Sequence, residues 1–203
     1  MLIKKDSKHN DIICAAISEF AEKGILATTM EAIAKRAQVS KRTLYKHYAN
    51  KELLLDMVVE LLLQRLKQFE QFVYDSTKPL LSQLREVAAL SIQLNSDVDF
   101  LRLSRIVIIE SMRSEHAAKR INEKFSVCEQ GLHYWFLQAA NAGALGKADP
   151  VFIASVFFGT IKKVSYWEQA IKWQAVLTEQ QANQLVDQVC HLVAHYVRVS
   201  LIE

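Results

Sequence analysis

An all-helical fold is what the sequence predicts, and three observations carry the prediction. Only 5 Gly and 2 Pro interrupt 203 residues, which leaves few of the turns that a strand-rich fold needs. Hydrophobic residues make up 51% of the chain and charged residues 23%, a composition typical of a globular rather than a disordered protein. Apolar residues also recur at helical spacing, so we expect long helices.

Residues 11–23 form the first predicted helix, because its apolar residues share one face and Gly24 follows where a left-handed residue is favoured. A second helix is expected over residues 30–37. Thr28 and Thr29 offer hydroxyl groups at its start, and Glu31 lies near the positive end of its dipole. The buried face of this second helix should consist of Ile33, Ala34 and Ala37.

A turn at Gln38 and Val39 leads to a third short helix over residues 41–47, for which Ser40 is the expected N-cap. Two short helices joined by such a turn are a helix-turn-helix motif. The inward side chains of the third helix are expected to be Leu44 and either Tyr45 or Tyr48.

The rest of the chain predicts longer helices. Asn50 should cap a fourth helix over residues 51–73, long enough to join two layers. Thr178 and Gln181 have the spacing of a capping box, which marks the start of the last helix. The helices expected beyond Pro79 cover residues 80–95, 97–113, 117–142, 150–172 and 179–200.

Positive charge gathers in the N-terminal quarter of the chain. Residues 1–52 hold ten Lys and Arg against six Asp and Glu, a net charge of +4, whereas the remainder holds fifteen against sixteen, a net charge of −1. A cationic helix-turn-helix is expected to meet a polyanion. We therefore expect a DNA-binding domain over residues 1–52 and a second helical domain over residues 53–203.

The second helix of the motif should enter the major groove of double-stranded DNA. Lys41 and Arg42 are the expected base-reading residues, because guanine presents two acceptors to a cation there. A basic helix face that is merely solvated is the alternative, and the order of caps, turn and helices argues against it. Phosphate contacts are expected from Thr29, Ser40, Thr43, Tyr45, Lys46 and Lys51.

The motif segment, residues 27–54, reads ATTMEAIAKRAQVSKRTLYKHYANKELL and resembles the N-terminal signature of the TetR family. The resemblance covers residues 11 to about 56 and implies phosphate contacts at Thr29, Ser40, Thr43, Tyr45, His47 and Lys51. For His47, a hydrogen bond within the motif is an equally weighted alternative. Gln38 departs from the glycine usual in the family, and a positive φ there would cost about 1 kcal/mol.

The family resemblance also implies the organisation of residues 53–203. They would form a helical bundle whose last two long helices make a homodimer and whose middle helices enclose a ligand pocket. Residues 100–103 with Glu110, and residues 150–159, resemble the C-terminal domain of the AefR-like branch. The expected activity is that of a repressor released from a palindromic operator by a small apolar or amphipathic ligand.

Candidate residues for these two roles come from large and apolar side chains on the expected helices. For the ligand pocket they are Met57, Leu61, Leu62, Leu103, Glu110, Trp135, Tyr166 and Trp167. For the dimer interface they are Phe157, Phe158, Ile161, Val164, Leu185, Val189, Leu192, Val193, Tyr196 and Val197. Ordinary core packing is the alternative for each. Glu110 lies in an apolar run, so it either reaches a surface or recognises something.

Other classes of protein find little support. His191 and His195 lie one turn apart without a third ligand, so no metal site is expected. Cys128 beside Glu129 is expected to be a small buried residue rather than a redox sensor, since an anionic neighbour raises a thiol pKa. We expect neither an enzyme nor a cofactor, and a cytoplasmic protein with no membrane partner. A DNA-binding module controlled by a protein partner remains an alternative.

Overall fold

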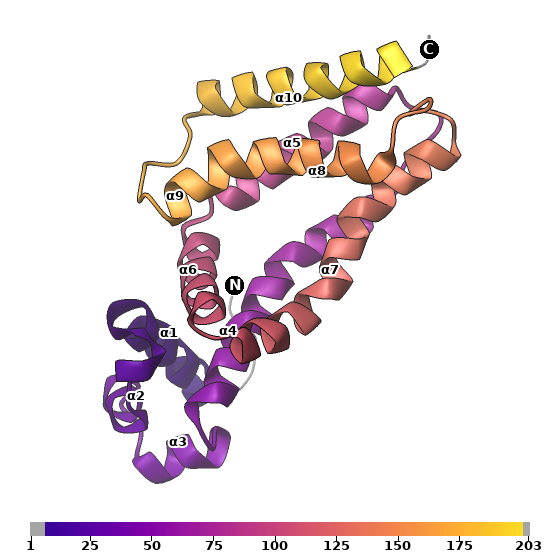
Figure 1. The fold of residues 1–203 in the computed structure, drawn as a ribbon. Coiled ribbons are helices and arrows are strands. Elements are labelled where there is room, and N and C mark those ends of the chain that lie inside the picture. The colour runs from indigo at the N-terminus through magenta and orange to yellow at the C-terminus, as the bar shows by residue number, and fades with distance from the viewer. Residues whose placement is uncertain (1–6, 201–203) are drawn as a thin grey trace. The chain divides into compact units, whose positions relative to one another are not determined.

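The computed structural model describes residues 7–200, with the side chains of all of these except residues 7, 70, 71 and 126–132. Throughout this range the regular elements are helices, which confirms the predicted fold class (Figure 1). The chain folds into two compact units. The first consists of Met1–Gln64 and Arg102–Lys124, and the second of Arg65–Leu101 and Phe125–Glu203. The expected division at residues 52 and 53 stays a prediction.

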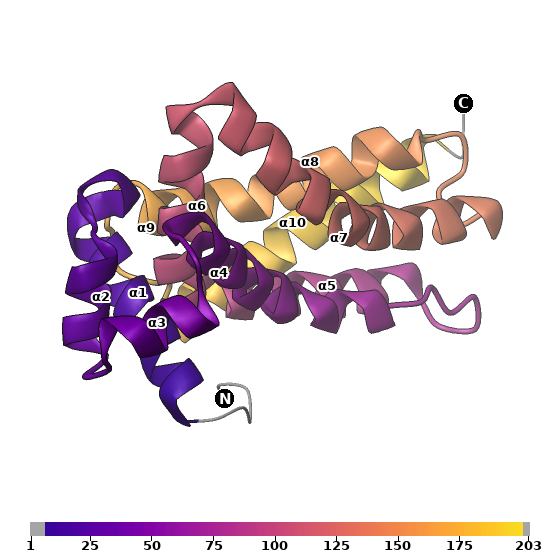
Figure 2. The same cartoon turned by 90° about the horizontal axis from the view of Figure 1, so that it is seen from below.

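The first unit begins with the helices that the sequence predicts. They are α1 (Ser7–Ala27), α2 (Met30–Arg36), α3 (Lys41–His47) and α4 (Lys51–Leu66), seen together in Figure 2. The predicted break at Gly24 is confirmed, because this residue has φ 75° and ψ 161° and kinks α1. Helix α1 starts four residues before the predicted Asp11.

Helix α2 packs against both α1 and α3, and the predicted buried face of the motif is confirmed. Ile33 and Leu44 are fully buried, and Ala34 and Ala37 are nearly so. Of the two tyrosines expected as alternatives for the inward position, Tyr48 is the buried one. Tyr48 is 6% exposed, whereas Tyr45 is 48% exposed. Tyr45 is therefore available to a partner of the motif.

The second unit is built on α5 (Leu80–Asn95), α8 (Pro150–Lys162) and α10 (Glu179–Ser200). Helix α10 packs along both α5 and α8, as Figure 1 shows. The predicted capping box is confirmed, since Oε1 of Gln181 accepts from N of Thr178 at 2.9 Å and N of Gln181 lies 3.3 Å from Oγ1 of Thr178. Two further helices, α6 (Val98–Arg113) and α7 (Glu115–Asn141), contribute residues to both units.

The core of the second unit is apolar and aromatic. Phe136 and Phe157, both fully buried, pack with their ring centroids 5.5 Å apart, and Trp135 lies 4.9 Å from Phe136. Cys190 of α10 is fully buried in the same core. No helix among the described residues is both long and apolar enough to span a membrane.

Two predicted helices differ in their C-terminal turns. Instead of continuing to residue 73, α4 passes into a 3-10 helix, η1 (Lys67–Gln71). The helix expected over residues 150–172 is interrupted after α8 by a π-helix, η2 (Lys163–Trp167), before the short α9 (Glu168–Ala170). Hydrophobic spacing predicts that a helix continues, but it does not distinguish these tighter and wider turns.

Candidate nucleic-acid interface

Both short helices of the motif begin at the predicted caps. Oγ1 of Thr29 accepts from N of Ala32 at 3.1 Å, and Oγ of Ser40 accepts from N of Thr43 at 3.0 Å. Each cap residue has an extended backbone, as an N-cap requires. The caps fix the residue at which each helix begins, and Ser40 lies at the positive end of the α3 dipole.

The turn between α2 and α3 uses a left-handed residue at the predicted position. Gln38 has φ 54°, and the chain is held there by hydrogen bonds from N of Gln38 to O of Lys35 at 3.2 Å and from N of Val39 to O of Ala34 at 3.0 Å. These bonds satisfy carbonyls at the end of α2. A glutamine at a position that favours glycine is therefore retained at a modest cost in strain.

Helix α3 presents polar and cationic side chains to solvent at every position except the buried Leu44. Lys41, Arg42, Tyr45, Lys46 and His47 are all exposed, and Thr43 is partly buried. Their shared helix is seven residues long and rests on α2 through the buried Leu44. The structure thus places on one short helix the predicted base-reading residues and four of the predicted phosphate contacts. Each of these contacts stays a prediction.

One of these cations, Lys41, forms an ion pair with an acidic residue of α2. Nζ of Lys41 lies 3.0 Å from Oε1 of Glu31, and this hydrogen bond holds the pKa of Glu31 below its usual value. Both side chains are more than half exposed, so water and salt screen the pair. Lys41 is therefore ion-paired with Glu31 in the absence of DNA. Of the two predicted base-reading residues, we expect Arg42 to contact a base edge more readily.

Lys51, a predicted phosphate contact, is placed differently from the residues of α3. Its Nζ donates to O of Ile25 at 2.7 Å, O of Thr28 at 2.7 Å and O of Leu26 at 3.2 Å. These carbonyls belong to the end of α1 and the link to α2. The ammonium is thus engaged with the backbone of the motif.

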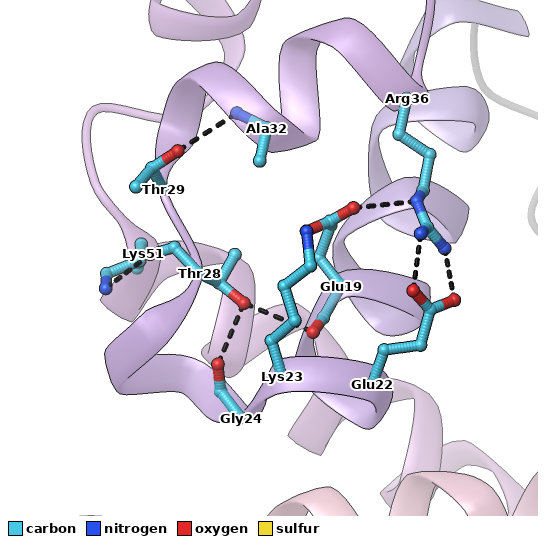
Figure 3. A network of polar contacts seen from close by, with 9 residues as sticks. All are labelled: Glu19, Glu22, Lys23, Gly24, Thr28, Thr29, Ala32, Arg36 and Lys51. Carbon is cyan, nitrogen blue, oxygen red and sulfur yellow. Dashed lines mark hydrogen bonds and ion pairs between the residues drawn. The ribbon is translucent and has the colours of Figure 1, made fainter.

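A polar network that the sequence did not predict joins α1 to α2 (Figure 3). Glu19 is buried in α1, and its Oε1 lies 2.8 Å from Nε of Arg36, while its Oε2 lies 2.7 Å from Nζ of Lys23. Arg36 also donates to both carboxylate oxygens of Glu22, at 2.6 and 2.5 Å. These bonds lower the pKa of Glu22 and raise that of Arg36. No spacing within one helix signals a pairing seventeen residues apart.

Aromatic and imidazole rings meet at the C-terminal end of α3. His9 of α1 stacks on Tyr48 with ring centroids 5.7 Å apart, and the Tyr48 hydroxyl lies 3.1 Å from Nδ1 of His9. Burial raises the pKa of Tyr48. The His47 ring lies 6.3 Å from that of His9 and is exposed, so both of its expected roles stay open.

The predicted ligand-pocket residues fall into both compact units. Glu110 is buried and its carboxylate accepts from Nε and Nη2 of Arg113, one turn further along α6. Of the two alternatives expected for Glu110, a surface position is wrong, because the side chain is buried and Arg113 offsets the cost of burying its charge. Recognition of a ligand stays a prediction. The first unit holds Met57, Leu61, Leu62, Leu103 and Glu110, and the second holds Trp135, Tyr166 and Trp167. Their role in a pocket stays a prediction.

Most of the predicted dimer-interface residues pack inside a single chain. Six of them are buried in the core of the second unit: Phe157, Ile161, Leu185, Val189, Val193 and Val197. Core packing, the expected alternative, accounts for these positions, and a contact with a partner subunit stays a prediction. Leu192, Tyr196 and Val164 are exposed, and Phe158 is partly buried. The apolar residues predicted on the last helix cover so broad a stripe that they include both the buried and the exposed face of α10.

The histidine and cysteine side chains bear on metal and redox chemistry. Among the described residues, no three His, Cys, Asp or Glu side chains gather in a way that suits a metal ion. Nδ1 of His191 lies 2.8 Å from O of Asp187. The Cys128 side chain lies outside the described residues.

Comparison with known proteins gives matches to both parts of the chain. Residues 12–58 match the family described as bacterial regulatory proteins, tetR family, and residues 82–197 match the AefR-like transcriptional repressor, C-terminal domain. The chain is 44% identical over 57 residues to the uncharacterized HTH-type transcriptional regulator YhgD of Bacillus subtilis (strain 168). That match spans 28% of this chain and 30% of YhgD, so it is confined to about a third of the relative.

Solved structures match over nearly the whole chain. A TetR family transcriptional regulator from Pseudomonas syringae pv. tomato str. DC3000 is 29% identical, with a TM-score of 0.81, covering 95% of this chain and 97% of that one. The flavonoid-responsive regulator FrrA is 26% identical, with a TM-score of 0.68, covering 93% and 95%. The SmeT–triclosan complex shares the fold at 20% identity, with a TM-score of 0.72, covering 92% and 91%. The chain therefore belongs to the TetR family and is a helix-turn-helix, DNA-binding transcriptional regulator with an AefR-like C-terminal domain.

Proposed function

We propose that this regulator is a repressor that binds a palindromic operator as a homodimer and leaves it when a small molecule binds the C-terminal domain. The observation that carries the DNA-binding part is the exposed face of α3, where Arg42, Tyr45 and Lys46 project from a helix capped by Ser40. Phosphate contacts by the hydroxyls and Lys46 would fix the register, and Arg42 would read a base edge.

Two subunits double the number of bases that can be read, and TetR-family regulators form dimers. Support for a contact face comes from exposed apolar side chains on α8 and α10. Phe152 and Tyr196 are both about half exposed, with ring centroids 6.3 Å apart, and Leu192 is 54% exposed on the same outer side of α10 as Tyr196. We propose that these residues, rather than the buried members of the predicted set, contact the partner subunit.

The ligand is proposed to be small and apolar or amphipathic. Two relatives with this fold support a small-molecule response by their names: one is flavonoid-responsive and another is a complex with triclosan. We propose that two polar contacts within the first unit transmit the effect of the ligand to α1 and α4. Nη2 of Arg102 in α6 donates to Oγ of Ser18 in α1 at 2.9 Å, and Nζ of Lys124 in α7 lies 3.3 Å from Oδ1 of Asp56 in α4.

The decisive experiment is selection of binding sites from a pool of random duplex DNA with the purified protein. A repressor of this design enriches a palindrome whose half-sites lie about one helical turn, roughly 10 base pairs, apart. Absence of any enrichment at moderate salt contradicts the proposal and favours a protein controlled by another protein. Release of the selected duplex by triclosan or by a flavonoid then tests the response to ligand.

The dimer face is tested by charge. Leu192→Lys should weaken self-association in sedimentation experiments, because burying an unpaired ammonium in an apolar interface is costly. Gln184→Lys, also exposed but about 80° around α10 from Leu192 and about 120° from Tyr196, is the matched control. Equal sedimentation of the wild type and Leu192→Lys would place the subunit contact elsewhere.

A further inference from the structure

Lys51 ties the start of α4 to the junction between α1 and α2. Three backbone carbonyls lie within 3.2 Å of its Nζ, those of Ile25, Leu26 and Thr28. An ammonium group has three protons to donate, and these three acceptors account for all of them. Binding of a DNA phosphate by Lys51 would therefore require that at least one of these hydrogen bonds be broken.

The three carbonyls need a donor because of where they lie. Ile25 and Leu26 lie in the last turn of α1, where carbonyl groups have no partner within the helix, and Thr28 lies in the link between α1 and α2. A cation at this end of the helix also interacts favourably with the negative pole of the helix dipole. Lys51 thus fits the backbone electrostatically as well as geometrically.

The tied segment leads directly into the DNA-facing part of the motif. Thr28 is buried, and its hydroxyl lies 2.8 Å from O of Gly24 and 3.2 Å from O of Glu19 (Figure 3). The next residue, Thr29, caps α2 through the amide of Ala32. The tether on O of Thr28 therefore fixes the point at which α2 starts, and α2 in turn supports α3.

We propose that Lys51 is a positioning residue for DNA binding, which sets α2 and α3 in register through backbone carbonyls and does not itself neutralise a phosphate. This inference rests on DNA binding by the motif. This role predicts that loss of Lys51 affects sequence-specific binding and non-specific binding to different extents. Loss of the tether should impair reading of bases, which depends on register, more than general attraction to phosphates, which does not.

The test compares Lys51→Met with Lys46→Met, the same substitution at an exposed lysine of α3. Binding of each variant is measured on a duplex selected from the random pool and on a random-sequence duplex of equal length, over a series of KCl concentrations. Folding of each variant is confirmed by its thermal transition, and binding is measured well below it. Lys51→Gln, which keeps amide donors for the carbonyls but has no charge, provides a second variant if Lys51→Met does not fold.

For Lys51→Met we expect about tenfold weaker binding to the selected duplex, the contribution of one charge-assisted hydrogen bond, with little change on the random duplex. The slope of log affinity against log salt should equal that of the wild type. Lys46→Met should instead reduce the magnitude of that slope by about 0.9 on both duplexes. Lys51→Gln should keep the wild-type slope and recover part of the selected-duplex affinity.

Two outcomes overturn the inference. A reduction of the salt slope by about 0.9 in Lys51→Met or Lys51→Gln, with equal loss on both duplexes, identifies a phosphate contact. Wild-type binding to both duplexes by a folded Lys51→Met reduces the tether to a stabilising contact without influence on DNA. Failure of the wild type to bind either duplex is a separate result, which refutes DNA recognition by the motif itself.

Discussion

Oε1 of Glu19 lies 2.8 Å from Nε of Arg36, and the glutamate side chain is only 4% exposed. A buried carboxylate is costly unless cations compensate it, and without Arg36 only Lys23 would remain on Glu19, so removing Arg36 alone is worse than removing both Arg36 and Glu19. Arg36→Met should lower the free energy of unfolding, measured by urea denaturation. The double variant Glu19→Leu with Arg36→Met should recover much of that loss. Glu22→Gln, which removes only the exposed partner of Arg36, should have little effect.

Arg42→Ala should reduce sequence preference more than affinity for DNA in general. A bidentate contact to guanine is worth about 1–3 kcal/mol of discrimination, whereas random duplexes offer no fixed base to read. Competition binding between the selected duplex and a random one measures the ratio. If Lys41→Ala reduces the ratio and Arg42→Ala does not, the base-reading assignment between these neighbours is reversed.

Ser40→Ala should destabilise the protein by about 1 kcal/mol, because the amide of Thr43 loses its acceptor. Ser40→Asp should keep the cap and the stability but repel phosphates, so that DNA binding falls while the thermal transition stays near that of the wild type. Thermal denaturation and duplex binding of both variants separate the two roles. Undiminished DNA binding by Ser40→Asp would argue that Ser40 lies away from the phosphate backbone.

Gln38→Gly should stabilise the protein by about 0.5–1 kcal/mol. Gln38 has φ 54°, where the side chain of an L-residue is strained, and the gain is reduced by the greater freedom of glycine in the unfolded chain. Gln38→Val should be destabilising, because a β-branched residue tolerates positive φ least. Chemical denaturation checks the order, and a Gln38→Gly variant less stable than the wild type would contradict it.

Cys190 predicts a pH dependence of stability. Burial raises the pKa of its thiol from 9.0 to about 11 in the folded protein. Between these values the unfolded chain loses the thiol proton and the folded chain keeps it, so the stability contributed by the protonated thiol falls as the pH rises. Urea denaturation at pH 8 to 11 should therefore show a steeper loss for the wild type than for Cys190→Ala. Parallel curves would mean that the thiolate is tolerated in the core.

Local signals in the sequence were reliable guides to the fold. The cap at Ser40, a threonine cap at Thr28 or Thr29 and the turn at Gln38 are all predicted, because each depends on neighbours within a few residues. The position of Asn50 as a cap is confirmed in the same way, with its Oδ1 3.0 Å from N of Leu53. Helix ends differed where a 3-10 or π turn replaced a regular one.

Signals that depend on distant partners were not available in the sequence. Lys51 had the charge expected of a phosphate contact, but its acceptors lie 23 to 26 residues earlier in the chain. Glu19 gave no sign of its pairing with Arg36. On α10, Val189 and Leu192 belong to one apolar stripe, yet only folding shows that the first is buried and the second exposed.

The π-helix η2 explains how one side of the chain from α8 to α9 stays buried at five positions spaced four residues apart. The residues at these steps are Ile153, Phe157, Ile161, Ser165 and Gln169, none more than 2% exposed. In an α-helix, positions four apart drift by about 40° around the axis, so such a series would turn away from the core. A wider turn holds more residues and rotates less per residue, which slows that drift where Ser165 and Gln169 follow. A regular α-helix over the same residues would instead place Gln169 about 80° around the axis from Ile161, off the buried side.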